Sequence, residues 1–212
     1  MNFESFCNFV DIFKTVLMIL PIVGYGDPVL RKKCEDITPD YPQLNELIDN
    51  MFETMSNAYG VGLAAPQVSL PIRLFVIDTA PFGEDEDLSE EERNFLAKFR
   101  KVFINARILE EDGKEWAFNE GCLSIPGVRE DVFRKPDIKI EYYDENFNKH
   151  TETYTGFAAR VIQHEYDHIE GVLFTDKLSS LKKKLNGKRL QNIMEGKVFP
   201  DYKMKFINKK GR

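Results

Sequence analysis

Two of the three histidines in the chain stand four residues apart, with a glutamate directly after the first, in the stretch QHEYDH at residues 163–168. Residues i and i+4 lie on one face of an α-helix, so His164 and His168 can bind one metal ion together. Glu165 lies beside that face, where a carboxylate can act as general base rather than as a ligand. The spacing therefore predicts a hydrolytic metal site of the kind found in zinc enzymes.

A short motif of this kind also occurs by chance on solvated helices. The residues before it argue against chance, because Phe157, Ala158 and Val161 extend the same face backwards by two turns and are all apolar. The two histidines are therefore expected to point inward. An inward-facing pair favours a metal site over an unrelated surface pair.

The motif leaves the third protein ligand open. One class of metalloproteases continues as HExxHxxGxxH, but this chain has Phe174 where the third histidine should stand. The remaining histidine, His150, follows a predicted hairpin turn and is expected to be exposed. An alternative interpretation is therefore a zincin-like endopeptidase whose third ligand is a downstream carboxylate. The candidates are Glu170, Asp176 and Glu195.

Cys122 offers a different third ligand, in the stretch EGCLSIP at residues 120–126. A free thiol is most often simply buried, but here Glu120 and Ser124 make the setting polar. One thiolate and two imidazoles form an allowed catalytic set that leaves a fourth position open. In the endopeptidase alternative Cys122 is inert, and in a second alternative the metal only stabilises a binding module in which Glu165 has no function.

The stretch GVGLAAPQ at residues 60–67 is unusually poor in large side chains. Its two glycines and two alanines let another backbone approach closely, although a tight turn followed by small core residues is the simpler interpretation. Gln67 favours a functional interpretation, because an amide donor just past a glycine-rich edge can reach an oxyanion.

In this order, the stretches at 60–67, 120–124 and 163–168 resemble the three signature motifs of bacterial peptide deformylases. The resemblance covers residues 18–178, and the segment around Asp27 and Pro28 is also similar to the start of the family's sequences. It implies a catalytic domain over 18–178, with an acidic insertion at about 83–92 in which seven of ten residues are acidic.

The resemblance implies that Cys122, His164 and His168 are the metal ligands and that water is the fourth. It implies one divalent ion, usually Fe²⁺ in the cell, for which Zn²⁺, Ni²⁺ or Co²⁺ can substitute. The implied reaction removes the formyl group from N-formylmethionine at the start of newly made polypeptides and releases formate, with the metal-bound water as nucleophile.

Further catalytic roles follow from the same resemblance. Glu165 matches the family's general acid/base, and Gln67 and the backbone N–H of Leu123 match the donors to the oxyanion. Glu120 and Arg134 are expected to form a supporting ion pair, and Asp167, which points off the ligand face, is expected to be a structural partner.

The methionine side chain of such a substrate requires an apolar slot, although core packing is the alternative for each residue that we assign to it. The predicted slot comprises Val61, Phe118, Phe157 and Val161. Backbone edges without bulk are predicted to bind the peptide as an added strand, at Gly60, Gly62 and Gly121. The resemblance places Arg129 near the peptide backbone.

Periodicity predicts the elements that must position these residues. Helices are expected at 43–58, 89–98, 156–169 and 179–195. Strands are expected at 71–77, 102–109, 115–118, 137–143 and 149–154. Because strands follow one another as neighbouring hairpins and helices are few, the predicted class is α+β, with antiparallel sheets packed around a central HExxH-bearing helix.

Composition limits the partners. A chain of 212 residues with a net charge of −6 is expected to be one domain with appendages, and it argues against specific DNA binding. Apolar runs are too short for a membrane span, so no membrane partner is expected. Three cysteines without paired spacing favour a reducing compartment, so the predicted location is the cytoplasm.

The two ends of the chain are predicted to be appendages. The apolar run at 16–23 is interpreted as a buried segment, because Glu4 and Asp11 precede it without a basic cluster. One hypothesis is that translation starts at Met18, which makes residues 1–17 an extension. Residues 179–212 are predicted to form a basic helix and tail. From 182 onward they contain eleven basic and two acidic residues, a charge of +9 against −15 for the rest. Such a tail is either a solvated end or a docking segment, for example for the ribosome.

Overall fold

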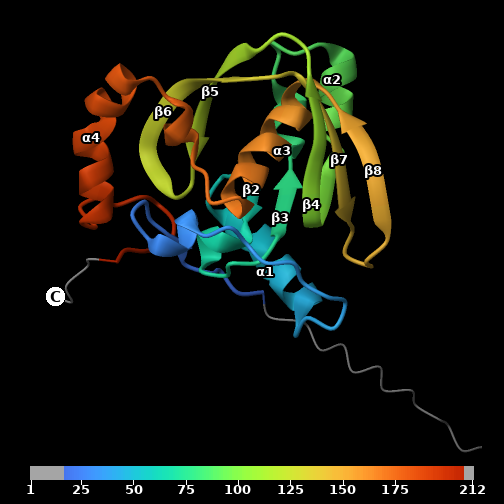
Figure 1. Ribbon diagram of the computed structural model, residues 1–212, viewed down its shortest axis with the longest axis horizontal. Coiled ribbons are helices and arrows are strands. Elements are labelled where there is room, and N and C mark those ends of the chain that lie inside the picture. Colours follow the sequence, from blue (N-terminus) through green and yellow to red (C-terminus); the bar gives the residue numbers. More distant parts are fainter. Residues whose placement is uncertain (1–16, 208–212) are drawn as a thin grey trace, which may run out of the picture.

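A five-stranded antiparallel sheet forms the centre of the computed structural model, which describes residues 17–207 (Figure 1). Its strand order is β2-β3-β4-β7-β8. The strands are β2 (Gly62–Ala64), β3 (Leu74–Asp78), β4 (Arg100–Asp112), β7 (Asp137–Tyr143) and β8 (Lys149–Tyr154). The predicted hairpin of 137–143 and 149–154 is confirmed. The strand predicted at 71–77 begins only at Leu74, because the backbone before it pairs with Glu35 instead, through an isolated parallel bridge at Ile72.

Strand β3 is apolar without alternation because both faces of the sheet are covered. Phe75 and Ile77 belong to the apolar cluster shared with helix α3 (Gly156–Ile169), whereas Leu74 and Val76 belong to the cluster shared with α1 (Leu44–Asn57). The two helices therefore lie on opposite faces of the sheet. Both begin and end within one residue of the predicted bounds.

A second, two-stranded sheet stands beside α3 (Figure 1). It is the hairpin of β5 (Trp116–Cys122) and β6 (Ile125–Arg134), joined by the two residues 123–124. Strand β6 is not among the predicted elements, since Pro126 and Gly127 near its start are typical of a turn. The α+β class with antiparallel sheets is confirmed.

The acidic segment lies largely on the surface, between the 3₁₀ turn η3 (Ala80–Glu84) and helix α2 (Glu90–Leu96). The hydroxyl of Ser89 caps α2 by accepting from the N–H of Glu92. Leu96 and Phe99 are buried and anchor the segment to the α3 side of the core. The other 3₁₀ turns are η1 (Pro28–Arg31), η2 (Ala65–Val68) and η4 (Phe174–Lys177).

The C-terminal segment returns to the body of the molecule after helix α4 (Ser180–Met194). Strand β9 (Met204–Lys205) pairs in parallel with β1 (Ile22–Val23), so the two ends of the described chain lie side by side. The predicted extension at 1–17 lies outside the described residues apart from Leu17. Among residues 17–207, no helix combines the length and apolar character that a bilayer crossing requires.

Candidate metal centre

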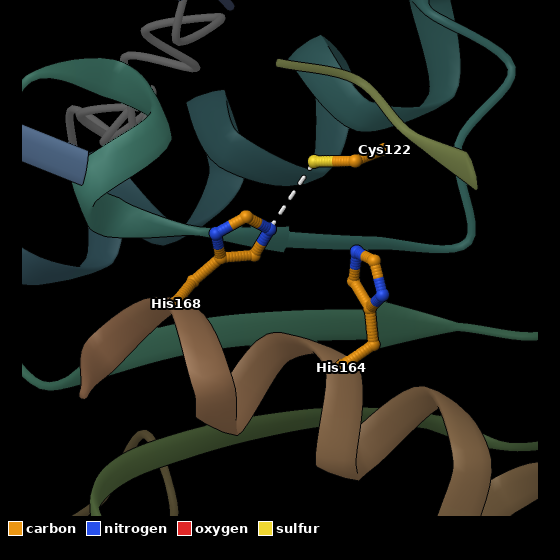
Figure 2. A group of neighbouring side chains, drawn as sticks. All are labelled: Cys122, His164 and His168. Carbon is orange, nitrogen blue, oxygen red and sulfur yellow. Dashed lines mark hydrogen bonds between the residues drawn. The ribbon is translucent and has the colours of Figure 1, made fainter. Parts of the chain in front are cut away.

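Three potential ligands meet between β5 and α3. Cys122 ends β5, and His164 and His168 project from adjacent turns of α3 toward its sulfur (Figure 2). The Cys122 Sγ atom lies 3.3 Å from Nε2 of His168, and one ligand atom of each residue lies within 4.8 Å of the others. Ligands at about 2.0–2.3 Å from a tetrahedral ion are separated by about 3.3–3.8 Å. The cluster therefore needs little adjustment to hold one ion.

Glu120 fixes the orientation of the His164 ring. Its Oε2 lies 3.0 Å from Nδ1 of His164, which leaves Nε2 for the cluster. A carboxylate behind a ligating histidine is the usual arrangement at metal sites, because it sets the tautomer and the direction of the ring.

Two buried guanidinium groups hold Glu120 in turn. Arg134 donates to both of its oxygens, at 2.7 and 2.9 Å, and Arg160 donates to Oε1 at 3.0 Å. Arg134 also donates to Asp167 at 2.6 Å. The predicted Glu120–Arg134 ion pair is thus confirmed. Arg160 was not predicted, although a single arginine one turn before His164, among apolar residues, is a signal that sequence can give.

The charges around the cluster affect its titratable groups in different directions. Burial raises the pKa of Glu120, but Arg134 and His164 outweigh burial and keep it far below its usual range, so this carboxyl stays ionised. Burial, reinforced by His164 and Arg134, lowers the pKa of His168 well below its ordinary value. His168 is therefore neutral, which is the form that binds metals.

Glu165 is buried directly against strand β2. Its side chain is 4% exposed, and its Oε2 has no hydrogen-bond partner among the described residues. Burial raises its pKa to about 7. A β-carbon at Gly62 would lie 2.7 Å from the Cγ of Glu165, so only glycine allows this approach.

Gln67 reaches the cluster from η2 on the other side of β2. Its Oε1 accepts from the N–H of Ala64 at 2.8 Å, which fixes the direction of the amide. Its Nε2 lies 3.6 Å from the sulfur of Cys122 and 3.3 Å from Oγ of Ser124. The amide hydrogens therefore face the cluster.

The turn after Cys122 places the backbone of Leu123 beside the cluster of Cys122, His164 and His168. The turn consists of residues 123–124, and the Leu123 side chain packs where Gly60 has none, since a β-carbon there would lie 2.7 Å from Leu123 Cδ1. The hydroxyl of Tyr202 donates to the Leu123 carbonyl at 2.7 Å. Tyr202 gave no signal in the sequence, because it lies 34 residues after the last histidine.

A cavity of about 550 Å³ opens in front of these groups. Most of the predicted substrate-binding residues line it, namely Gly60, Val61, Gly62, Phe118, Gly121, Arg129 and Val161. Phe157 does not. Its ring packs edge-on behind Phe118, with 5.0 Å between centroids, so its predicted place in the slot is corrected to one of support. The lining residues that were not predicted include Tyr59, Pro81, Phe82 and Tyr202.

The alternative third ligands are engaged elsewhere. His150 is half-buried rather than exposed, stacks on Tyr142 and lies 2.9 Å from Asp144. Glu170 pairs with Arg73 and Lys33, and Asp176 with Arg31. Glu195 pairs with Lys197. Within residues 17–207, Cys122, His164 and His168 form the one group of such ligands close enough to share an ion.

Comparison with known proteins places this geometry in a family. The family described as Polypeptide deformylase matches residues 19–184, so the segment that carries Tyr202 lies outside the match. A protein named peptide deformylase from Christiangramia forsetii is 69% identical over 193 residues, which cover 91% of this chain and 98% of the relative. A peptide deformylase from Cytophaga hutchinsonii is 52% identical over 91% of this chain and all of its own.

Solved structures of peptide deformylases have the same fold as this chain. The crystal structure of a peptide deformylase from Legionella pneumophila superposes with a TM-score of 0.72 at 34% identity, over 85% of this chain and 98% of that one. The crystal structure of peptide deformylase from Thermus thermophilus gives the same TM-score at 36% identity, over 85% of this chain and all of that one.

Proposed function

The chain belongs to the peptide deformylase family, and from that premise we propose that it hydrolyses the formyl group from N-formylmethionine at the start of newly made polypeptides, releasing formate. It is therefore a hydrolase. The observation that carries the specific mechanism is the meeting of Cys122, His164 and His168 beside the buried carboxylate of Glu165.

One divalent ion held by these three side chains fits the donor set. A thiolate and two imidazoles suit the borderline-soft first-row metals, and three protein ligands leave a position open. Fe²⁺ is the ion that we propose in the cell, with Zn²⁺, Ni²⁺ or Co²⁺ as substitutes. When bound, such an ion lowers the pKa of water and polarises a carbonyl oxygen.

The residues around the ion divide the remaining work. Glu165 accepts a proton from the attacking water and returns it to the departing amine. Its side chain lines the cavity, so it can reach both groups. Nε2 of Gln67 and the N–H of Leu123 donate to the formyl oxygen as negative charge develops on it. Helix α3 is the centre of this arrangement, since it supplies Glu165 and both histidines.

The peptide is proposed to lie between β2 and β5. Each strand pairs on one side alone within the described residues, which leaves a free edge toward the cavity. A peptide added as a strand can bind to these edges, with Arg129 beside it. The methionine side chain then enters the slot formed by Val61, Phe118 and Val161.

Incubation with formyl-Met-Ala-Ser tests the proposal. Protein prepared without oxygen, since a thiolate ligand is oxidisable, should release formate and leave the peptide bonds intact. Cys122→Ser should abolish release, whereas Cys34→Ser, which alters a buried thiol elsewhere, should retain it. Cleavage inside the peptide, or full activity of Cys122→Ser, would instead favour the endopeptidase.

A cytoplasmic enzyme that docks on the ribosome through its basic C-terminal segment is a further part of this proposal. Leu181 and Leu185 on α4 are exposed next to a run of lysines. Reversing the charge at Lys184 and Lys188 should weaken co-sedimentation with ribosomes without changing turnover of small peptides. Unchanged co-sedimentation would end this part of the proposal.

A further inference from the structure

We propose that Tyr202, from the C-terminal segment, is a positioning residue for the Leu123 amide. Its hydroxyl donates to the Leu123 carbonyl at 2.7 Å and thereby fixes the turn that presents the Leu123 N–H to the cavity. This role rests on the proposed function, in which that N–H binds the formyl oxygen.

The turn at 123–124 is held from outside its own hairpin at both carbonyls. The Leu123 carbonyl accepts from the hydroxyl of Tyr202, and the Ser124 carbonyl accepts from the N–H of Tyr25 at 2.8 Å. The Leu123 N–H lies in the peptide plane before Leu123, and the Leu123 carbonyl in the plane after it, so only the two backbone dihedrals of Leu123 join them. Because Cys122 pairs with Ile125 on one side of the turn, fixing the Leu123 carbonyl on the other side restricts both dihedrals and with them the direction of the N–H. The pairing of β5 with β6 is irregular between Gly121 and Cys122, so the ladder alone does not set this geometry.

The two residues that hold the turn flank the pair of strands, β1 and β9, that joins the two ends of the described chain. Tyr25 follows β1, and Tyr202 precedes β9. Two backbone hydrogen bonds of 2.9 Å join these strands, from Ile22 to Lys203 and from Gly24 to Lys205. The C-terminal segment is thus fastened directly after Tyr202, which is held in place by more than its own hydrogen bond.

The surroundings of Tyr202 hold its ring in place and so favour a stable hydrogen bond to the Leu123 carbonyl. Its ring packs with Leu123 against the apolar cluster on the α1 side of the sheet, and it also lines the cavity. At neutral pH a phenol is protonated and can donate. The hydrogen bond from Tyr202 sets the direction of the turn, and an oxyanion donor depends on its direction to act in the transition state.

Tyr202→Phe in the full-length, metal-loaded protein removes the hydroxyl and keeps the ring. Loss of one neutral hydrogen bond changes an equilibrium by up to about tenfold, so kcat for formyl-Met-Ala-Ser should fall about 3- to 10-fold. KM should change by less than about twofold, because a donor used as charge develops affects the transition state more than the bound substrate. Backbone amide exchange should accelerate within 121–125.

Tyr41→Phe is the matched control, since Tyr41 packs against the same cluster but has no contact with the turn among the described hydrogen bonds. It should leave kcat and exchange in 121–125 unchanged. Bound metal, measured per chain, should be equal in both variants and the wild type.

Three results would overturn the role of Tyr202. The first is an unchanged kcat with unchanged exchange in the turn. The second is a raised KM at constant kcat, which would make Tyr202 a substrate contact. The third is faster exchange across the whole chain, which would make it a general structural residue. If the wild type releases no formate, the proposed function fails, and amide exchange still tests the contact separately.

Discussion

Gly62 shows at the scale of one residue how tightly the site is built. Its missing side chain leaves the space that the Glu165 carboxylate occupies, and a β-carbon would lie 2.7 Å from Cγ of Glu165. The close approach of Glu165, the proposed general base, is therefore enough to require a glycine at this position.

Gly62→Ala should therefore displace Glu165 while leaving the three metal ligands in place. A displacement of about 1 Å at a catalytic group can cost about 100-fold, so kcat should fall by at least about tenfold with normal metal content. Gly187→Ala is the control, because nothing lies within 4 Å of a β-carbon there. Steady-state kinetics and metal analysis measure both. Normal kcat in Gly62→Ala would contradict the position assigned to Glu165.

Residue types and spacing predicted the residues of the candidate site better than the residues that hold them in position. His164, Glu165 and His168 follow from helical periodicity, and Cys122 from a polar setting for a thiol. Arg160 and Tyr202 did not follow, because a residue that orients another acts through three-dimensional contact and carries no motif of its own.

At the scale of elements, strands β4, β7 and β8 are connected by a polar network. Lys101 of β4, Tyr142 of β7 and Tyr154 of β8 all donate to the carboxylate of Glu152. Burial raises the pKa of Glu152, but these hydrogen bonds outweigh burial and lower it to about 2. Its unfolded value is about 4.3, so the ionised form stabilises the folded state.

The sign of this shift gives a pH dependence. A depressed pKa contributes stability above about pH 4.3, and that contribution is lost as the pH falls toward about 2. Glu152→Gln should therefore lower the Tm at pH 7, and the difference from the wild type should shrink at pH 3. Glu86→Gln, at an exposed position, should show no such difference. A gap in Tm that is the same at pH 7 and pH 3 would rule out the network as its cause.

Long periodic elements were predictable, whereas short ones were not. Helix α3 and the β7–β8 hairpin have clear periods of 3.6 and 2. Strands β1 and β9 have two residues each, which is too short for any period. Pairing between them depends on where the rest of the chain brings its two ends.

At the scale of the whole molecule, the proposed ion joins β5 of the small sheet to α3, which packs on the large sheet. Binding to the folded state alone stabilises a protein, by about 2.7 kcal/mol at a free ligand concentration 100 times Kd. For a chain of this size, about 1 kcal/mol corresponds to about 2–4 °C in Tm.

Removal of the metal by a chelator should therefore lower the Tm of the wild type by about 5–10 °C, estimated from the same relations. Thermal unfolding with and without chelator measures this. Cys122→Ser should show a much smaller shift, and Cys34→Ser should behave as the wild type. Equal shifts in both variants would place the stabilising ion elsewhere.

The sequence also predicted the α+β class, but not the return of the C-terminal segment to the cavity. That return matters for the charge asymmetry, because the basic segment is not one uniform tail. Its helix α4 presents lysines at the surface, whereas residues 202–205 pack against the body.

X-ray absorption at the metal edge of the zinc-loaded protein tests the central claim most directly. One sulfur at about 2.3 Å and two imidazole nitrogens at about 2.0–2.1 Å are predicted around the ion, and the sulfur signal should vanish in Cys122→Ser. A first shell of nitrogen and oxygen alone in the wild type would contradict the site.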